Sequence, residues 1–305
     1  MTKPQHKKHR GVIVPMITPV NKRLLIDLEA IEKIIHSFME VEVCPFVLGT
    51  TGESVSISDS QKALLVKSVI GHLNKRVKTY AGISGNCLSE SIENAKQYAD
   101  MGVDAVVAHL PFYYPLSSTQ MLHYYEQLAN SIPLPLILYN NPITTKYSVP
   151  LEVIEQLSHH PNIEGVKDSE RGVERLDESI RLWSNREDFS HLVGWAAQSA
   201  YALQKGSDGI VPSTGNVTPK IYRDLYQSVI NGNFEKANEL QEETNRISEI
   251  YQKDRNLSQS IPALKTMMSA FGLCDPFVLP PMYDLDTLDQ EQIKGKTLAI
   301  TKPFE

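Results

Sequence analysis

The sequence of 305 residues predicts an α/β fold, a (β/α)₈ TIM barrel followed by a C-terminal helical extension. Three observations support this: short apolar segments recur along the chain, segments of helical periodicity separate them, and the strand signal stops after Pro219. Successive apolar segments begin 27 to 34 residues apart, until a last step of 18. A barrel of roughly 250 residues allots about 31 residues to each of its eight βα units, so the spacing fits.

The predicted strands are short and almost continuously apolar. They cover residues 11–17, 45–48, 77–83, 104–108, 134–139, 163–167, 190–194 and 208–211. Such runs are typical of strands that are buried on both faces of a parallel sheet. An open, doubly wound sheet would have a similar rhythm, but the chain has no G-x-G-x-x-G motif after the first strand and no P-loop signature. The closed barrel is therefore favoured.

Segments with an apolar residue every three or four positions lie between the strands, and the first of them, residues 27–41, begins at a suitable N-cap, Asp27. The others cover residues 58–73, 89–101, 119–130, 150–159, 171–183 and 197–205, and then 221–231, 233–253, 254–270 and 288–300. We therefore expect a basic tail over residues 1–10, a barrel over 11–231 and a helical region over 232–305 that packs against the barrel.

The composition, 41% hydrophobic and 22% charged, is that of a globular protein with enough apolar residues for a large core. The 30 basic and 36 acidic residues give a net charge of −6, which argues against a nucleic-acid partner. The basic residues among residues 1–10 have no hydrophobic face beside them, so we expect a flexible, solvated tail. No uncharged apolar run approaches the ~20 residues of a membrane span, and we expect a cytoplasmic protein.

The cysteines and histidines do not form the patterns of metal sites. Cys44, Cys87 and Cys274 are far apart and odd in number, which predicts reduced thiols in the core. The nine histidines contain no H-x-x-x-H pair, so no metal is expected. His109 could line a pocket at the end of the fourth strand, although packing is the role that we expect.

Hydroxyl side chains follow the second predicted strand, at the end of the barrel where chemistry takes place. Residues 49–52 read Gly-Thr-Thr-Gly, so backbone N–H groups and the hydroxyls of Thr50 and Thr51 are presented together. Such donors suit a carboxylate or phosphate oxygen. The alternative is a tight turn in which Glu53 caps the next segment.

A phenol and an amine end the fifth and sixth predicted strands. Tyr139 could be a packing residue at the rim of the barrel or a catalyst. Lys167 follows an apolar run, and a lysine that is held in such a setting is more often the free, nucleophilic amine that forms a Schiff base with a ketone. Alternatively, Lys167 reaches outward and pairs with Asp168 or Glu164.

Three motifs follow one another along the chain: Gly49-Thr50-Thr51-Gly52-Glu53, Tyr139-Asn140-x-Pro142 and Gly165-Val166-Lys167-Asp168. Together they resemble the dihydrodipicolinate synthase/N-acetylneuraminate lyase family of class I pyruvate aldolases. The resemblance runs from about Val12 to the C-terminal helices. It includes the Pro-Phe-Tyr-Tyr sequence of residues 111–114 and the Gly-Ile-Val sequence of residues 209–211.

The resemblance implies a Schiff base between Lys167 and the keto carbon of pyruvate or another 2-oxo acid. Tyr139 would shuttle protons during imine formation and C–C cleavage, because a phenol becomes a useful base beside a cation. Thr50 would link Tyr139 to Tyr113, which in this family often reaches in from a neighbouring subunit. The resemblance thus implies that the enzyme needs no cofactor. It also implies a homo-oligomer, namely a homotetramer built as a dimer of dimers.

The resemblance also implies a binding site for pyruvate. Thr51 and Thr50, with the N–H groups of the loop between Gly49 and Gly52, would hold its carboxylate. The backbone of Val211 would close the other side of the pocket.

Two positions depart from the pattern of the synthases. Thr144 stands where dihydrodipicolinate synthases usually carry an arginine that binds the second substrate's carboxylate. Trp195 and small neighbours follow the seventh strand, where the synthases commonly have acidic residues. These departures indicate a differently shaped second-substrate pocket.

The leading hypothesis is therefore a class I lyase that reversibly cleaves a 2-oxo acid, a 2-keto-3-deoxy-sugar acid or a sialic-acid-like compound, to pyruvate and an aldehyde. One alternative is a 4-hydroxy-tetrahydrodipicolinate synthase that condenses pyruvate with aspartate semialdehyde. Others are a dehydratase or deaminase of the same family, and a catalytically silent barrel.

Overall fold

The computed structural model describes residues 7–300, and it confirms the predicted (β/α)₈ barrel. Its eight strands form one closed sheet in chain order. They are β1 (Gly11–Pro15), β2 (Cys44–Val47), β3 (Tyr80–Gly82), β4 (Ala105–His109), β5 (Leu136–Asn140), β6 (Ile163–Asp168), β7 (Ser190–Val193) and β8 (Gly209–Ile210). Every residue of β4 and of β5 is buried, as the apolar runs predict.

Helices follow the strands and continue after the last of them. They are α1 (Leu28–Glu40), α2 (Asp59–Leu73), α3 (Leu88–Met101), α4 (Ser118–Ser131), α5 (Pro142–Thr145), α6 (Leu151–Leu157), α7 (Val173–Trp183), α8 (Ser199–Lys205), α9 (Pro219–Ile230), α10 (Phe234–Gln252), α11 (Leu257–Ala270) and α12 (Thr287–Leu298). Short 3₁₀ turns are η1 (Ser54–Ser56), η2 (Ala196–Gln198) and η3 (Ser213–Asn216). The helix expected from residue 254 begins later, because Asn256 and Gln259 form a capping box there.

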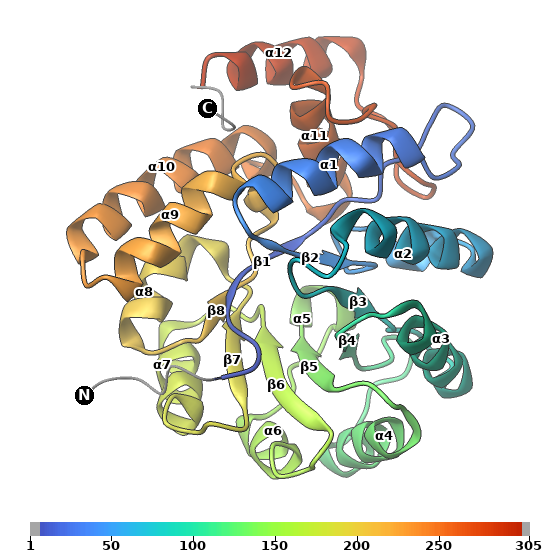
Figure 1. Ribbon diagram of the computed structural model, residues 1–305, viewed down its shortest axis with the longest axis vertical. Helices are drawn as coiled ribbons and strands as arrows, with labels where there is room; N and C mark the ends of the chain where they lie inside the picture. Colours follow the sequence, from blue (N-terminus) through green and yellow to red (C-terminus); the bar gives the residue numbers. More distant parts are fainter. Residues whose placement is uncertain (1–6, 301–305) are drawn as a thin grey trace. The chain divides into compact units, whose positions relative to one another are not determined.

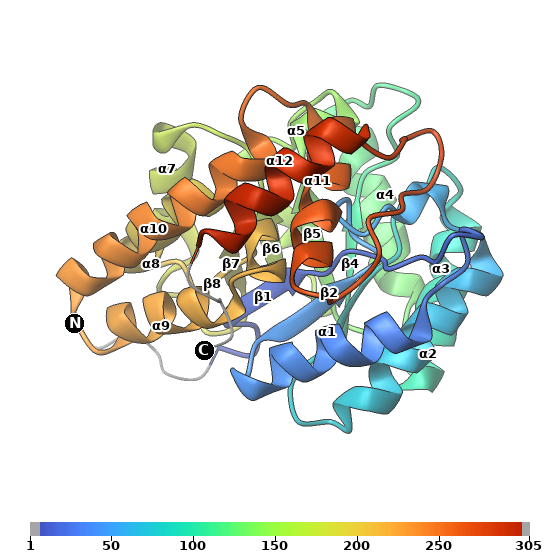
Figure 2. The same cartoon turned by 90° about the horizontal axis from the view of Figure 1, so that it is seen from above.

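The chain forms two compact units. The first consists of the N-terminal segment up to Ile13 and of Lys78–Pro212, and the second of Val14–Val77 and the chain from Ser213 onward. In the first unit, β5, β6 and β7 lie side by side, and α4 and α6 pack against each other outside them (Figure 1). In the second unit, α10 packs along α9 and α11 packs along α12 (Figure 2). The expected boundary between residues 231 and 232 stays a prediction.

The N-terminal segment differs from the expected solvated tail. Lys7 is 4% exposed, and its Nζ lies 2.8 Å from Asp208 Oδ2. His9 is 2% exposed, and its Nε2 lies 2.8 Å from Glu164 Oε2. The prediction is therefore wrong for Lys7 and His9, because these polar groups have acidic partners far along the chain that the local sequence does not reveal, whereas Lys8 and Arg10 are exposed. The first six residues of the predicted tail lie outside the described residues.

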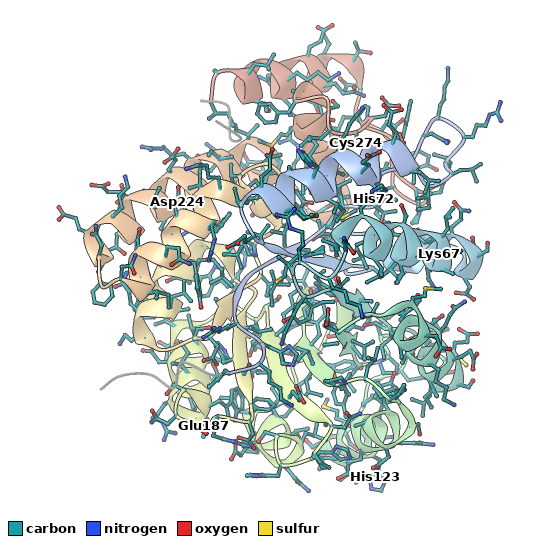
Figure 3. All side chains as sticks on the ribbon, viewed as in Figure 1. Lys67, His72, His123, Glu187, Asp224 and Cys274 are labelled. Atoms are coloured by element: carbon teal, nitrogen blue, oxygen red, sulfur yellow. The ribbon has the colours of Figure 1, made fainter. Side chains whose placement is uncertain are left out.

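The cysteines and histidines are scattered, as their spacing suggests. Cys274 is buried and Cys44 is half-buried, but Cys87 is exposed, so the prediction of core thiols is wrong for Cys87. His123 lies at the outer surface of α4 (Figure 3). Among residues 7–300, no three His, Cys, Asp or Glu side chains are grouped as a metal site would require. No helix in this part of the chain has the length and apolarity to cross a membrane.

Candidate active site

Three side chains form a row across neighbouring strands of the first unit. His109 on β4 is in register with Tyr139 on β5, and Tyr139 is in register with Lys167 on β6. Residues in register on neighbouring parallel strands point to the same side of the sheet. Lys167 Nζ lies 3.9 Å from the centroid of the Tyr139 ring, and the His109 and Tyr139 ring centroids are 6.0 Å apart. The structure thus brings together the amine and the phenol that end two strands.

Lys167 is buried, with 5% of its surface exposed. The alternative that it reaches outward to a carboxylate is wrong, because Asp168 pairs with Arg175, and Glu164 pairs with Lys8 and His9. Burial lowers the pKa of Lys167 below the usual 10.5, and the contact with Tyr139 opposes this shift in part. At neutral pH, a larger fraction of Lys167 is therefore the free amine than in an exposed lysine.

Tyr139 is also buried, and its hydroxyl has a polar partner in the next turn. Only 4% of its surface is exposed, and its Oη accepts a hydrogen bond from Asn141 Nδ2 at 3.0 Å. The Nζ atom of Lys167 lies over one face of the ring. The phenol therefore lies among polar groups that allow it to accept and release a proton. It does not lie at a purely apolar packing surface.

His109, for which packing is the predicted role, lies at the end of the row. It is 6% exposed, and its Nδ1 lies 2.8 Å from the carbonyl oxygen of Leu110, which assigns the ring proton to Nδ1. Burial lowers the pKa of His109 below 6.5, and the charge of Lys167 lowers it further. His109 is consequently a neutral imidazole beside Tyr139 at physiological pH.

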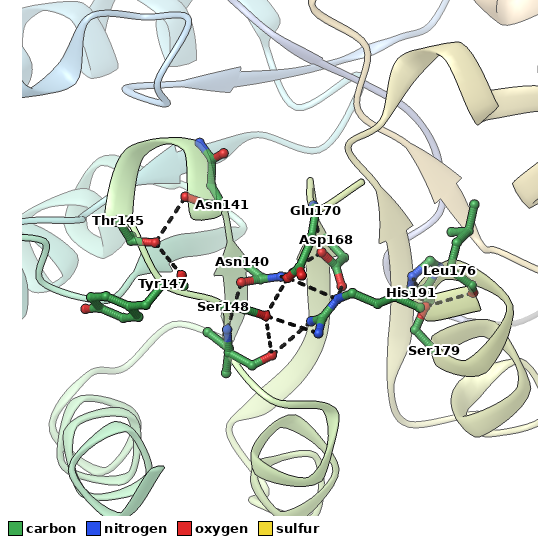
Figure 4. A network of polar contacts seen from close by, with 12 residues as sticks. Asn140, Asn141, Thr145, Tyr147, Ser148, Asp168, Glu170, Leu176, Ser179 and His191 are labelled. Carbon is green, nitrogen blue, oxygen red and sulfur yellow. Dashed lines mark hydrogen bonds and ion pairs between the residues drawn. The ribbon is translucent and has the colours of Figure 1, made fainter. Parts of the chain in front are cut away.

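A network of polar side chains supports the row from the other face of the sheet (Figure 4). Asn140 and Asp168 each follow a member of the row on the same strand, so they point to the opposite face. Asn140 Nδ2 donates to Asp168 Oδ1 at 2.9 Å and to Glu170 Oε2 at 2.8 Å. Arg175 Nε, from α7, donates to Asp168 Oδ2 at 2.8 Å. The network therefore joins the ends of β5 and β6 to α7.

Arg175 compensates the buried charge of Asp168. Burial raises the pKa of Asp168 above 3.8, and the guanidinium of Arg175 opposes the shift. Arg175 Nη2 also donates to the carbonyl oxygen of Val149 at 2.9 Å. Sequence reasoning missed Arg175, because a single basic residue in an amphipathic helix has no motif. The sequence does contain one signal: a polar residue, Asn140 or Asp168, directly follows Tyr139 and Lys167, which indicates polar contacts on the other face of both strands.

In the second unit, residues 49–53 form a compact turn after β2. The N–H of Gly52 donates to the carbonyl oxygen of Gly49 at 3.1 Å, and Thr50 and Thr51 are half-buried. A Cβ on Gly49 would lie 2.9 Å from the Phe46 ring, so a larger residue would force that ring to move. Gly49 is therefore required by its close packing against Phe46, and Gly52 by the carbonyl oxygen of Met16, which would lie 3.0 Å from an added Cβ.

The side chain of Glu53 does not cap the segment that follows this turn, so the alternative role predicted for it is wrong. Glu53 is instead fully buried and forms an ion pair with Lys265 of α11. Its Oε2 accepts a hydrogen bond from the N–H of Leu279 at 2.7 Å, and Lys265 Nζ donates to the carbonyl oxygen of Phe277 at 2.8 Å. The turn is thus anchored to the C-terminal part of its own unit.

Comparison with known proteins identifies the family. The sequence model of the dihydrodipicolinate synthetase family matches residues 8–300. The chain belongs to this family. It is 30% identical over 294 residues to a 4-hydroxy-tetrahydrodipicolinate synthase of Neisseria meningitidis serogroup C / serotype 2a, with 95% of this chain and 98% of the relative covered. The protein is thus a lyase of the dihydrodipicolinate synthetase family.

Solved structures of the family have the same fold. Dihydrodipicolinate synthase from Bacteroides thetaiotaomicron is 31% identical and superposes with a TM-score of 0.90, covering 98% of this chain and 99% of its own. YagE, a prophage protein of Escherichia coli K12 that belongs to the dihydrodipicolinic acid synthase family, was solved in complex with pyruvate. It is 26% identical, with a TM-score of 0.90, and 95% of this chain and 98% of YagE are covered.

The other residues that the family resemblance implicates lie in loops and turns of the first unit. Tyr113 follows β4 and is 74% exposed. Thr144 is half-buried in α5, and its hydroxyl donates to the carbonyl oxygen of Asn141 at 3.1 Å. Trp195 is half-buried before η2, and Val211 is buried after β8. No arginine takes the place of Thr144, so this family member differs from the synthase pattern here.

Proposed function

We propose that the protein reversibly cleaves a 2-oxo acid to pyruvate and an aldehyde through an imine on Lys167. The observation that carries this proposal is the buried amine of Lys167, 3.9 Å from the ring centroid of Tyr139. Burial lowers the pKa of Lys167, so the amine is available as a nucleophile. A silent barrel would have no need of a buried lysine whose burial costs stability.

The cleavage proceeds in four steps. The Lys167 amine attacks the keto carbon, the Tyr139 phenol gives its proton to the departing hydroxyl, and loss of water leaves a protonated imine and a phenolate. The Tyr139 phenolate takes the proton of the hydroxyl on C4, the bond between C3 and C4 breaks, and its electron pair moves to the imine nitrogen to form an enamine. The aldehyde leaves, and C3 of the enamine takes up the proton from Tyr139. Addition of water to the imine releases pyruvate and restores Lys167.

The binding roles of the other residues are part of the same proposal. Thr50 and Thr51 hold the carboxylate, and Val211 bounds the pyruvate pocket with its backbone. Tyr113 serves a neighbouring subunit in a homo-oligomer, a dimer of dimers. The chemistry needs no metal or organic cofactor, because the protonated imine itself accepts the electron pair.

A 2-keto-3-deoxy-sugar acid or a sialic-acid-like compound is the substrate class that we favour. Thr144 supplies a hydroxyl where a synthase would supply a guanidinium, and a hydroxyl suits a polyhydroxylated substrate better than a second carboxylate. Trp195 and its small neighbours leave a differently shaped pocket for the aldehyde part. The pyruvate complex of YagE supports pyruvate as one of the ligands.

A second candidate is a 4-hydroxy-tetrahydrodipicolinate synthase. Two relatives that are named as synthases, those from Neisseria meningitidis and Bacteroides thetaiotaomicron, are 30% and 31% identical to the chain. A dehydratase or deaminase would use the same imine. Consumption of aspartate semialdehyde in the presence of pyruvate distinguishes the synthase from the lyase, which should instead release pyruvate from 2-keto-3-deoxy acids.

Borohydride reduction in the presence of pyruvate tests the imine directly. We expect a stable adduct on the peptide that contains Lys167, no adduct in Lys167→Arg, and an unchanged adduct in Lys205→Arg, whose lysine is exposed on α8. Tyr139→Phe should lower turnover by roughly 10²-fold or more while the fold is retained. The absence of an adduct on Lys167 in the unmodified protein would refute the proposal.

A further inference from the structure

The side chain of Asn141 is directed at the phenol of Tyr139. The two residues are separated by one position, so they point to the same side of the extended chain that ends β5. Asn141 Nδ2 donates to Tyr139 Oη at 3.0 Å, and both side chains are buried, Asn141 with 6% of its surface exposed. A buried hydrogen bond of this kind is stronger than one in water, because the surroundings screen it less.

Asn141 is also the N-cap residue of α5, but its side chain makes no capping hydrogen bond. Asparagine is among the preferred N-cap residues because its side-chain oxygen accepts a backbone N–H of the first turn. Here the backbone carbonyl of Asn141 accepts the N–H of Thr144 at 3.0 Å and that of Thr145 at 3.1 Å. The Thr145 hydroxyl donates to the same carbonyl (Figure 4). The main chain is thus fixed, and the amide is available to Tyr139.

Ionisable side chains face the Tyr139 ring from both neighbouring strands, Lys167 on β6 and His109 on β4. Burial lowers the pKa of both side chains, so burial disfavours a positive charge on either of them beside a phenolate. The amide of Asn141 does not titrate, so the hydrogen bond that it donates to the phenol oxygen does not depend on the protonation of Asn141 itself.

We infer that Asn141 is a positioning residue that stabilises Tyr139 as the phenolate, the form that removes a proton from the substrate. This inference rests on the proposed function, because it assigns Tyr139 the role of base in imine chemistry. A donor that is fixed against the phenol oxygen stabilises the anion more than the neutral phenol. Asn141 occupies the variable position of the Tyr-Asn-x-Pro motif, so the motif itself does not predict this role.

Exchange of the pyruvate methyl protons in deuterium oxide, followed by proton NMR, tests the inference without knowledge of the aldehyde. Exchange requires the imine on Lys167 and then a base that removes a proton from C3. The rate should rise with pD as Tyr139 becomes the phenolate. Asn141→Leu removes the donor, and Asn141→Asp keeps the shape but places a carboxylate against the phenol oxygen.

We expect the midpoint of the rising limb to move to higher pD by about one unit in Asn141→Leu and by more in Asn141→Asp. At pD 7, exchange by Asn141→Leu should be slower by roughly tenfold. Asn185→Asp is the matched control, because Asn185 is exposed in the loop after α7, and its profile should coincide with that of the unmodified protein. Exchange by Lys167→Arg gives the background.

Borohydride trapping of pyruvate in each variant separates the inference from the proposed function. Equal adduct on Lys167 with a shifted rising limb supports both. Equal adduct with an unshifted limb, including a uniform loss of rate at every pD, overturns the role of Asn141 and leaves the imine chemistry intact. Absence of the adduct in the unmodified protein overturns the proposed function, and the inference with it.

Discussion

Burial of Lys167 prepares it for chemistry at the expense of stability. The buried environment that lowers the pKa of Lys167 disfavours its ammonium form. In the unfolded chain the ammonium is solvated, and Lys167 stays protonated up to its usual pKa of 10.5. The folded protein therefore carries an unfavourable contribution at every pH at which Lys167 would be protonated in the unfolded chain. This contribution is greatest below the lowered pKa, and it disappears as the pH rises towards 10.5. The folded state should accordingly gain from removal of this amine.

We predict that Lys167→Met is more stable than the unmodified protein at pH 7, by about 1 kcal/mol or more, although it forms no imine. Methionine is unbranched and apolar, so it can occupy the same space without a buried charge. Urea unfolding at a series of pH values measures the difference, which should shrink as the pH approaches 10. A variant that is less stable than the parent at neutral pH would contradict this reading of Lys167.

At the scale of elements, the ends of β5 and β6 are held together by polar groups on the face opposite the row. Asp168 accepts from Asn140 on the neighbouring strand and from Arg175 on α7. Because Tyr139 and Lys167 are the preceding residues of the same strands, the network fixes their register. The position of the Lys167 amine against the Tyr139 phenol therefore depends on the packing of β5, β6 and α7, and not on these two side chains alone.

Replacement of Arg175 alone should lower the free energy of unfolding more than replacement of Arg175 and Asp168 together. Arg175→Met leaves Asp168 buried without its cation, and we predict a loss of about 3 to 5 kcal/mol in the free energy of unfolding. In Asp168→Asn/Arg175→Met most of this loss should be recovered, because the buried residue 168 is then neutral, and Glu170, the other carboxylate that pairs with Arg175, is 25% exposed. Denaturant unfolding of both single variants and the double variant measures the coupling. Additive losses would show that the two residues do not act together.

The sequence allows the strands to be predicted well, because residues that are buried on both faces are continuously apolar, as in β4 and β5. It also allows Tyr139 and Lys167 to be placed at strand ends. It does not reveal α5, which is only four residues long and has no helical period. Nor does it reveal the partner of Asp168, since Arg175 lies seven residues away in another element, and tertiary packing alone selects it.

At the scale of the whole molecule, long-range ion pairs tie the start of the chain to the later strands of its unit. Glu164 at the start of β6 accepts from His9 at 2.8 Å and from Lys8 at 2.6 Å. The hydrogen bond from His9, together with that from Lys8, lowers the pKa of Glu164 to about 2. The N-terminal segment is therefore part of the folded unit, and it contributes to stability through a carboxylate.

This contribution has a defined dependence on pH. The carboxylate of Glu164 stabilises the folded state above the unfolded pKa of 4.5, and the stabilisation is lost as the pH falls from there to about 2. We predict that Glu164→Gln is less stable than the unmodified protein at pH 6 and that the two stabilities converge as the pH falls. Thermal unfolding between pH 6 and pH 3 measures this. A constant difference over that range would rule out the carboxylate as its source.

The buried pair of Glu53 and Lys265 has a consequence for how this family member can be altered. A chain shortened to end before α11 would lose both partners of the Glu53 carboxylate, the Lys265 ammonium and the N–H of Leu279, and Glu53 follows Thr50 and Thr51 closely in the sequence. The turn of residues 49–53 and the C-terminal helices should therefore be kept together whenever either is transferred to another protein or redesigned.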